Sequence, residues 1–138
     1  MTSSLVDSNV LIDIINPTSS FAGWSRQAVL RAAAAGKVVI NQIVLAETAA
    51  SFLNAEKLDS AISHIAMTRE SLPWEAAHRA GIAHALYRRA GGPRERVLPD
   101  FLIGAHASVM GYRLVSRDAV RFRSYFPDLT IIAPDTHP

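Results

Sequence analysis

The sequence predicts an α/β fold in which a short parallel β-sheet of about five strands is sandwiched between helices. Short, continuously apolar segments alternate with longer segments of helical periodicity, which is typical of strands buried on both faces. Two of these segments, Leu5–Val6 and Leu114–Val115, are followed within three residues by an aspartate. Because sites in such sheets form outside the carboxyl ends of the strands, we expect both aspartates at one edge.

The elements follow from apolar spacing, helix caps and Gly or Pro breaks. In the first half we expect a strand at 5–6, an apolar segment at 10–15, a helix at 21–35 capped by Thr18 or Ser19, a strand at 38–40, a helix at 42–53 and a helical face at 58–65. The helix at 42–53 is apolar nearly all round, so we expect it deep inside the protein. In the second half we expect a weak strand at 70–72, a helix at 74–90 closed by the run 91–93, a helix at 99–110, a strand at 114–115, a short helix at 119–124 and a strand at 129–132.

Length and composition restrict the class of protein. The 138 residues suit one compact domain, which we expect to span residues 1–138. The absence of cysteine excludes disulfide scaffolds, thiol catalysis, zinc fingers and iron–sulfur clusters. No apolar run approaches the ~20 residues of a membrane span, and the first residues lack a signal pattern, so we expect a cytoplasmic protein without a membrane segment.

Four acidic residues stand where these elements place chemistry. Asp7 and Asp118 follow strands, and Asp100 lies in the first turn of a helix, so each has an ordinary explanation as a cap or a helix-dipole partner. Glu47 lies in the apolar helix with no basic residue within one turn, and a buried carboxylate needs a partner, a cation or a proton. Converging acids would repel each other by roughly 3–4 kcal/mol a pair, so such a cluster needs shared protons or a divalent cation. Oxygen-only ligation favours Mg²⁺ or Mn²⁺.

Four segments of the chain resemble, in order and spacing, the motifs of PIN domains. They are Val6–Asp13, Leu45–Glu47, Leu98–Ala105 and Val115–Asp118. Each segment is weak alone, but four in order on the expected elements are fairly specific, and the resemblance covers essentially the whole chain. The size of the chain and its opening on the first strand resemble VapC-type toxins of bacterial toxin–antitoxin modules.

The resemblance implies a metal-dependent endoribonuclease. Asp7, Glu47 and Asp100 would ligate Mg²⁺ or Mn²⁺, directly or through water, and Asp118 would be a fourth acid of the catalytic group. A cation held in this way lowers the pKa of a bound water, and in-line attack would leave a 5′-phosphate and a 3′-hydroxyl.

Further residues take roles through the same resemblance. Asn9 and Ser116 would orient the carboxylates through hydrogen bonds. Serine stands at positions 8 and 116, where many relatives have threonine, and the hydroxyl is kept. Ile103 and Gly104 occupy the turn where some relatives carry an extra acid, which leaves one or two metals open. Histidine is not needed as a base, and we interpret the histidines as structural or surface residues.

Eight of the fourteen basic residues are arginines at 88–96 and 113–123, beside the two later acidic motifs. A solvated helix face explains each of them, but basic groups around a metal site also suit a polyanionic substrate. We expect Arg117 to contact an RNA phosphate.

The resemblance also implies a cognate antitoxin that covers the site and a homodimer. Phe52 and Leu53 could receive an antitoxin segment, although both could equally be core. Two other readings stay open. One is a PIN-like RNA-binding or scaffold module in which the acids only cap helices. The other is a different Mg²⁺-dependent phosphoesterase, such as a flap-type DNA nuclease or a phosphatase.

Overall fold

A computed structural model of the chain describes residues 1–52, 54–92 and 98–138. These residues form one five-stranded sheet in the order β3-β2-β1-β4-β5, and every neighbouring pair is parallel. Seven helices flank the sheet within the described residues. The predicted α/β fold class is therefore confirmed.

The strands are short and the helices carry most of the chain. The strands are β1 (Ser4–Val6), β2 (Val38–Ile40), β3 (Thr68–Arg69), β4 (Arg113–Val115) and β5 (Ile131–Ile132). The helices are α1 (Ser8–Ile15), α2 (Ala22–Ala35), α3 (Gln42–Ser51), α4 (Ala55–Ile65), α5 (Trp74–Arg89), α6 (Leu98–Met110) and α7 (Val120–Tyr125). Within the described residues, no helix is long and apolar enough to cross a membrane.

Two boundaries differ from the prediction. The third strand lies at 68–69 rather than 70–72, because its partner β2 ends at Ile40 and leaves residues 71–72 nothing to pair with. Neither Thr18 nor Ser19 caps α2. The Ser19 hydroxyl accepts a hydrogen bond from the Phe21 amide, and α2 begins after Phe21 with no side-chain cap.

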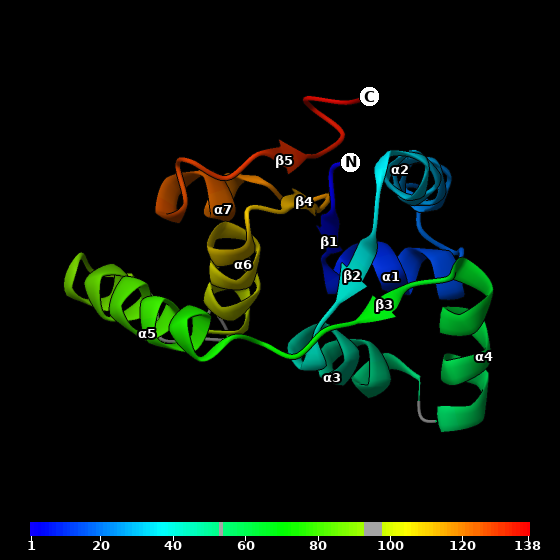
Figure 1. Cartoon of the computed structure of the whole chain (residues 1–138), viewed down its shortest axis with the longest axis horizontal. Helices are drawn as coiled ribbons and strands as arrows, with labels where there is room; N and C mark the ends of the chain where they lie inside the picture. Colours follow the sequence, from blue (N-terminus) through cyan, green and yellow to red (C-terminus); the bar gives the residue numbers. More distant parts are fainter. Residues whose placement is uncertain (53, 93–97) are drawn as a thin grey trace.

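The helices lie in two layers with the sheet between them (Figure 1). Helices α5, α6 and α7 lie to one side of β1, and α1, α2 and α4 lie to the other (Figure 1). Leu5 and Val6 of the central strand are fully buried. Such two-sided cover explains why these strands are continuously apolar.

The expectation that the helix at 42–53 is deeply buried is wrong. In α3 only Val44 and Thr48 are buried, and Leu53 lies outside the described residues. Figure 1 places α3 near the end of β2 and below the sheet, and it packs against α1 and α6 rather than covering a sheet face. Only one stripe of α3 is therefore removed from water, and Glu47 lies on its half-buried side.

Candidate active site

Asp7 lies at the carboxyl end of the central strand and begins the site. It is the N-cap of α1, and its Oδ1 accepts a hydrogen bond from the Ser8 amide at 2.8 Å. Its Oδ2 accepts a hydrogen bond from the Ser116 hydroxyl at 2.8 Å. Asp7 is only 4% exposed, and burial raises its pKa to about 7 although these hydrogen bonds oppose the shift. The expected cap therefore exists, but capping leaves this buried carboxyl short of positive charge.

Glu47 and Asp100 approach Asp7 from α3 and α6. The Ser8 hydroxyl donates to Glu47 Oε1 at 3.0 Å, so Ser8 contacts both Asp7 and Glu47. Burial raises the pKa of Glu47, and the charge of Asp100 raises it further. Burial also raises the pKa of Asp100, while its ion pair with Arg121 opposes the shift. The charges of Asp100 and Glu47 in turn raise the pKa of Asp7.

Asp118 lies at the outer margin of this group. It is exposed, and its backbone amide donates to the Ser116 hydroxyl oxygen at 3.1 Å. The residue that caps α7 is Ala119, so the alternative reading of Asp118 as that cap is wrong. Its charge raises the pKa of Asp100, which places it within electrostatic reach of the other acids. We call Asp7, Glu47, Asp100 and Asp118 the acidic edge.

The chemistry of the acidic edge fits a hard divalent cation. All its donors are carboxylate oxygens, and Asp7, Glu47 and Asp100 each have a pKa raised above the ordinary value. Within the described residues, however, no three Asp, Glu or His side chains stand close enough together to hold one ion. The guanidinium of Arg121 supplies the nearby positive charge through its pair with Asp100.

Comparison with known proteins identifies the family. A PIN domain family model matches residues 4–125. The chain belongs to the PIN-domain family. A comparison with curated proteins found no significant match.

Several solved structures are similar to this PIN domain, and one of them is a toxin–antitoxin complex. VapBC2 from Rickettsia felis, bound to a DNA fragment from its promoter, matches with a TM-score of 0.70 at 17% identity over 96% of this chain and 98% of that chain. FitAcB from Neisseria gonorrhoeae matches with a TM-score of 0.65 at 20% identity over 98% of this chain and 99% of that chain. A toxin–antitoxin complex from Klebsiella pneumoniae matches with a TM-score of 0.63 at 19% identity over 96% of this chain and 98% of that chain. The predicted resemblance to PIN domains and VapC-type toxins is confirmed at the level of the fold.

The two expected orienting residues behave differently in this PIN domain. Ser116 contacts Asp7 directly, as described above. Asn9 does not meet the expectation, because its Oδ1 accepts a hydrogen bond from the Arg117 amide at 3.4 Å and it makes no described hydrogen bond to a carboxylate. Asn9 lies in the first turn of α1 beside the segment that follows β4, so its nearest partner is backbone. It ties α1 to that segment.

The expected phosphate contact, Arg117, is held by an acid that sequence reasoning missed. Asp13 is 1% exposed, and its Oδ2 lies 3.0 Å from Arg117 Nε and accepts a hydrogen bond from the Ser25 hydroxyl at 2.7 Å. The guanidinium also lies over the Phe21 ring, 5.2 Å from its centroid. The sequence did carry one sign of this buried acid, because Asp13 is the single carboxylate in the apolar run at 10–15. Arg117 thus compensates a buried charge beside the acidic edge.

Other arginines near the later motifs are also paired. Arg121 pairs with Asp100, and Arg123 binds both carboxylate oxygens of Asp135 at 2.7 and 2.8 Å. Arg88 and Arg89 are exposed at the end of α5, and the two arginines at 94 and 96 lie outside the described residues. The expected ring of substrate-facing arginines is therefore reduced, because tertiary pairing already neutralises part of it.

A second buried network joins the two helices that carry Glu47 and Asp100. His106 of α6 is fully buried, with Nδ1 3.0 Å from Asn41 Nδ2 and Nε2 3.0 Å from Glu70 Oε1. Asn41 caps α3 with its side-chain oxygen, so its amide nitrogen donates to His106, which donates in turn to Glu70. The interpretation of His106 as structural agrees with this network. It fixes the start of α3 to α6.

Proposed function

We propose that this PIN domain is a Mg²⁺- or Mn²⁺-dependent endoribonuclease that hydrolyses RNA phosphodiester bonds and acts as the toxin of a type II toxin–antitoxin pair. The observation that carries the proposal is the buried Asp7 carboxyl, whose pKa is raised to about 7 beside Glu47 and Asp100. Acids in this arrangement are stable as anions only with added positive charge. The chain would act as one domain over residues 1–138.

In this proposal Asp7, Glu47 and Asp100 hold the cation, directly or through water, and Asp118 supports them from the exposed margin. When bound, the cation supplies positive charge against the phosphodiester and makes a water molecule more acidic. Ser116 keeps Oδ2 of Asp7 in place, and Ser8 does the same for Oε1 of Glu47. These hydrogen bonds fix the direction of the carboxylates before substrate arrives.

Arg117 remains the proposed phosphate contact. Its side chain is 31% exposed, and its pairing with Asp13 holds it next to the segment that carries Ser116 and Asp118. A guanidinium held in this way loses little conformational entropy when it meets a phosphate. RNA would then be held mainly by its backbone.

Cleavage of total RNA by the purified chain tests the proposal, with Mn²⁺ or with EDTA. We expect cleavage with Mn²⁺ that EDTA abolishes, and loss of at least about 100-fold in Asp7→Ala and Asp7→Asn. Asp128→Asn, which changes an exposed acid after α7, is the control and should cleave like the unmodified chain. Cleavage that survives EDTA, or that Asp7→Ala retains, would overturn the assignment.

Two further arms separate the alternatives. Without prior phosphorylation, the 5′ ends of the fragments should ligate to the 3′-hydroxyl of an RNA adaptor, because hydrolysis of this kind leaves a 5′-phosphate. Single-stranded DNA in the same assay tests the DNA nuclease alternative, which predicts faster cleavage of DNA than of RNA. RNA binding without cleavage of either polymer would favour the scaffold alternative.

The partners follow as part of the same proposal. The similarity to a toxin–antitoxin complex from Klebsiella pneumoniae supports a cognate antitoxin. The half-buried Phe52 after α3 is one apolar side chain that it could contact. A homodimer is proposed with it, and RNA as substrate implies action in the cytoplasm. Co-purification with the product of a small neighbouring gene, which should also suppress cleavage, tests the antitoxin.

A further inference from the structure

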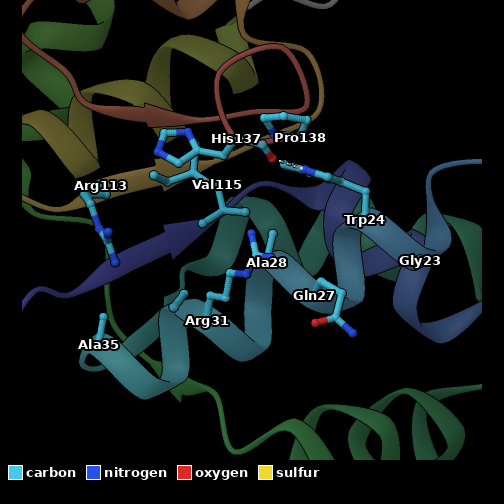
Figure 2. A pocket seen from close by; sticks show the side chains of 12 residues that line it. Gly23, Trp24, Gln27, Ala28, Arg31, Ala35, Arg113, Val115, His137 and Pro138 are labelled. Atoms are coloured by element: carbon cyan, nitrogen blue, oxygen red, sulfur yellow. Dashed lines mark hydrogen bonds between the residues drawn. The ribbon is translucent and has the colours of Figure 1, made fainter.

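A cavity among the described residues lies away from the acidic edge. It has a volume of about 400 Å³ and lies between α2, the strands β4 and β5, and the chain end at His137 and Pro138 (Figure 2). Arg113 stands at the amino end of β4, whereas Asp7 follows the carboxyl end of β1. We call this cavity the α2 pocket.

Two arginines enter the α2 pocket from different walls. Arg31 rises from α2, and Arg113 comes from β4 with its guanidinium directed toward Ala35 (Figure 2). None of the residues lining the pocket is Asp or Glu. Within the described residues neither arginine has a carboxylate within 4.0 Å. The two guanidiniums of the pocket therefore have no close carboxylate partner in the described part of the chain.

Arg113 also has an unused hydrogen-bond donor. Its Nη2 donates to the Ser4 hydroxyl at 3.3 Å, but its Nε is buried and has no partner in the described part of the chain. A buried donor without a partner costs free energy, and a donor that carries charge costs more.

Apart from Gln27 and His137, the other residues that line the pocket are apolar. Ala28 and Ala32 of α2 and Val115 of β4 are buried, and with Ile132 of β5 they form the apolar floor of the pocket. Trp24 lines one end, and its Nε1 donates to the His137 carbonyl at 2.7 Å, which fixes the indole at the rim (Figure 2). Such walls suit a flat or apolar body rather than a fully hydrated ion.

We propose that the α2 pocket binds a small anion with a flat apolar body, held through its phosphate or carboxylate by Arg31 and Arg113. The body would lie over the apolar floor of the pocket, next to Trp24. The volume falls in the range of about 300–1,000 Å³ that is typical of small-molecule sites. The site is separate from the proposed ribonuclease chemistry and does not depend on it.

Tryptophan fluorescence offers a direct test because the chain has only two tryptophans, Trp24 in the pocket and the 92% exposed Trp74. In a Trp74→Phe background, Trp24 reports occupancy during titration with adenosine 5′-monophosphate, benzoate or inorganic phosphate. We expect a saturable change with the nucleotide or with benzoate, and the tighter of the two identifies phosphate or carboxylate as the anionic group. No saturable change with either would overturn the proposal, as would equally tight binding of inorganic phosphate.

Matched variants locate the binding. Arg31→Gln and Arg113→Gln should each weaken it about tenfold, the effect of one lost charged hydrogen bond. Arg26→Gln, an exposed arginine of the same helix outside the pocket, should leave it unchanged. Ala35→Glu keeps both arginines but brings a carboxylate to the rim, and it should abolish binding while RNA cleavage persists. Equal effects of Arg26→Gln and Arg31→Gln, or undiminished binding by folded Ala35→Glu, would contradict the site.

Discussion

The acidic edge and the α2 pocket are opposite in charge and similar in physical situation. At the edge, burial and mutual repulsion raise the pKa of three carboxyls, and Arg121 is paired with only one of them. In the pocket, two guanidiniums enter a cavity that no acidic side chain lines. Elsewhere charges pair off at the surface, as in Arg123 with Asp135. Like charges gathered without partners in a partly buried place therefore indicate a ligand, whereas paired surface charges do not.

The largest effect on stability is expected from Asp7→Asn, which removes the charge of Asp7. Because its pKa in the folded state is about 7 against 3.8 in the unfolded chain, its favourable contribution is present below pH 4 and is lost as the pH rises to 7. The loss amounts to about 4 kcal/mol at most. Asp7→Asn keeps the volume and the cap of α1, so it should be more stable than the unmodified chain at pH 8, with a much smaller difference at pH 4.

Urea unfolding at pH 4 and pH 8 measures this difference. At pH 8, Mn²⁺ should raise the melting temperature of the unmodified chain but not that of Asp7→Asn, because only an ionised Asp7 gains from a cation. If the free energy of unfolding of the two proteins depends equally on pH, ionisation of Asp7 does not destabilise the folded state.

His106→Ala comes next and tests what keeps the edge together. It removes two buried hydrogen bonds and leaves the Asn41 amide without its acceptor, so it should lower the free energy of unfolding by about 3 kcal/mol. Cleavage should fall as well, because the start of α3 and hence Glu47 loses its tie to α6. His64→Ala, on an exposed face of α4, is the control and should change stability by less than about 0.5 kcal/mol. Full RNA cleavage by folded His106→Ala would show that the His106 network does not position the acidic edge.

Ser116→Ala is expected to have a smaller effect that depends on pH. It removes the hydrogen bond that favours ionised Asp7, so it should raise the pKa of Asp7 further. The cost in unfolding free energy should be about 1.5 kcal/mol at pH 8 and less at pH 4, where Asp7 is protonated. Ser124→Ala, an exposed serine of α7, supplies the comparison. A cost independent of pH would mean that Ser116 acts on the backbone near Asp118 instead.

The smallest expected effect is on the stability of Arg31→Gln. Arg31 is exposed and has no carboxylate partner in the described chain, so chemical unfolding without ligand should change by less than about 0.5 kcal/mol. Its affinity for the pocket anion should nevertheless fall. A large loss of stability would show that Arg31 stabilises the fold. Its charge would then not be one left without a partner for a ligand.

Local patterns determined most of the architecture. The apolar runs of β1, β2 and β4 and the face of α4 that buries Leu58 and Ile62 were predicted correctly, since strand burial and helix periodicity are read over a few neighbouring residues. The positions of Asp7 and Asp100 followed from strand ends and a helix start in the same way. The exposed side of α3 was missed because its composition does not show that it packs beside the sheet end rather than against a sheet face.

By itself the sequence determined an α/β fold, a metal-suited set of acids and a likeness to PIN domains. Only the tertiary structure decided which charges are already paired, because the partners lie far apart in the chain. Ser116 and Asp7 are separated by 109 positions, and His106 and Asn41 by 65. No periodicity links Arg117 to Asp13, or Arg31 to Arg113. Whether a charge is neutralised or left for a ligand depends on contacts that form only when the layers pack.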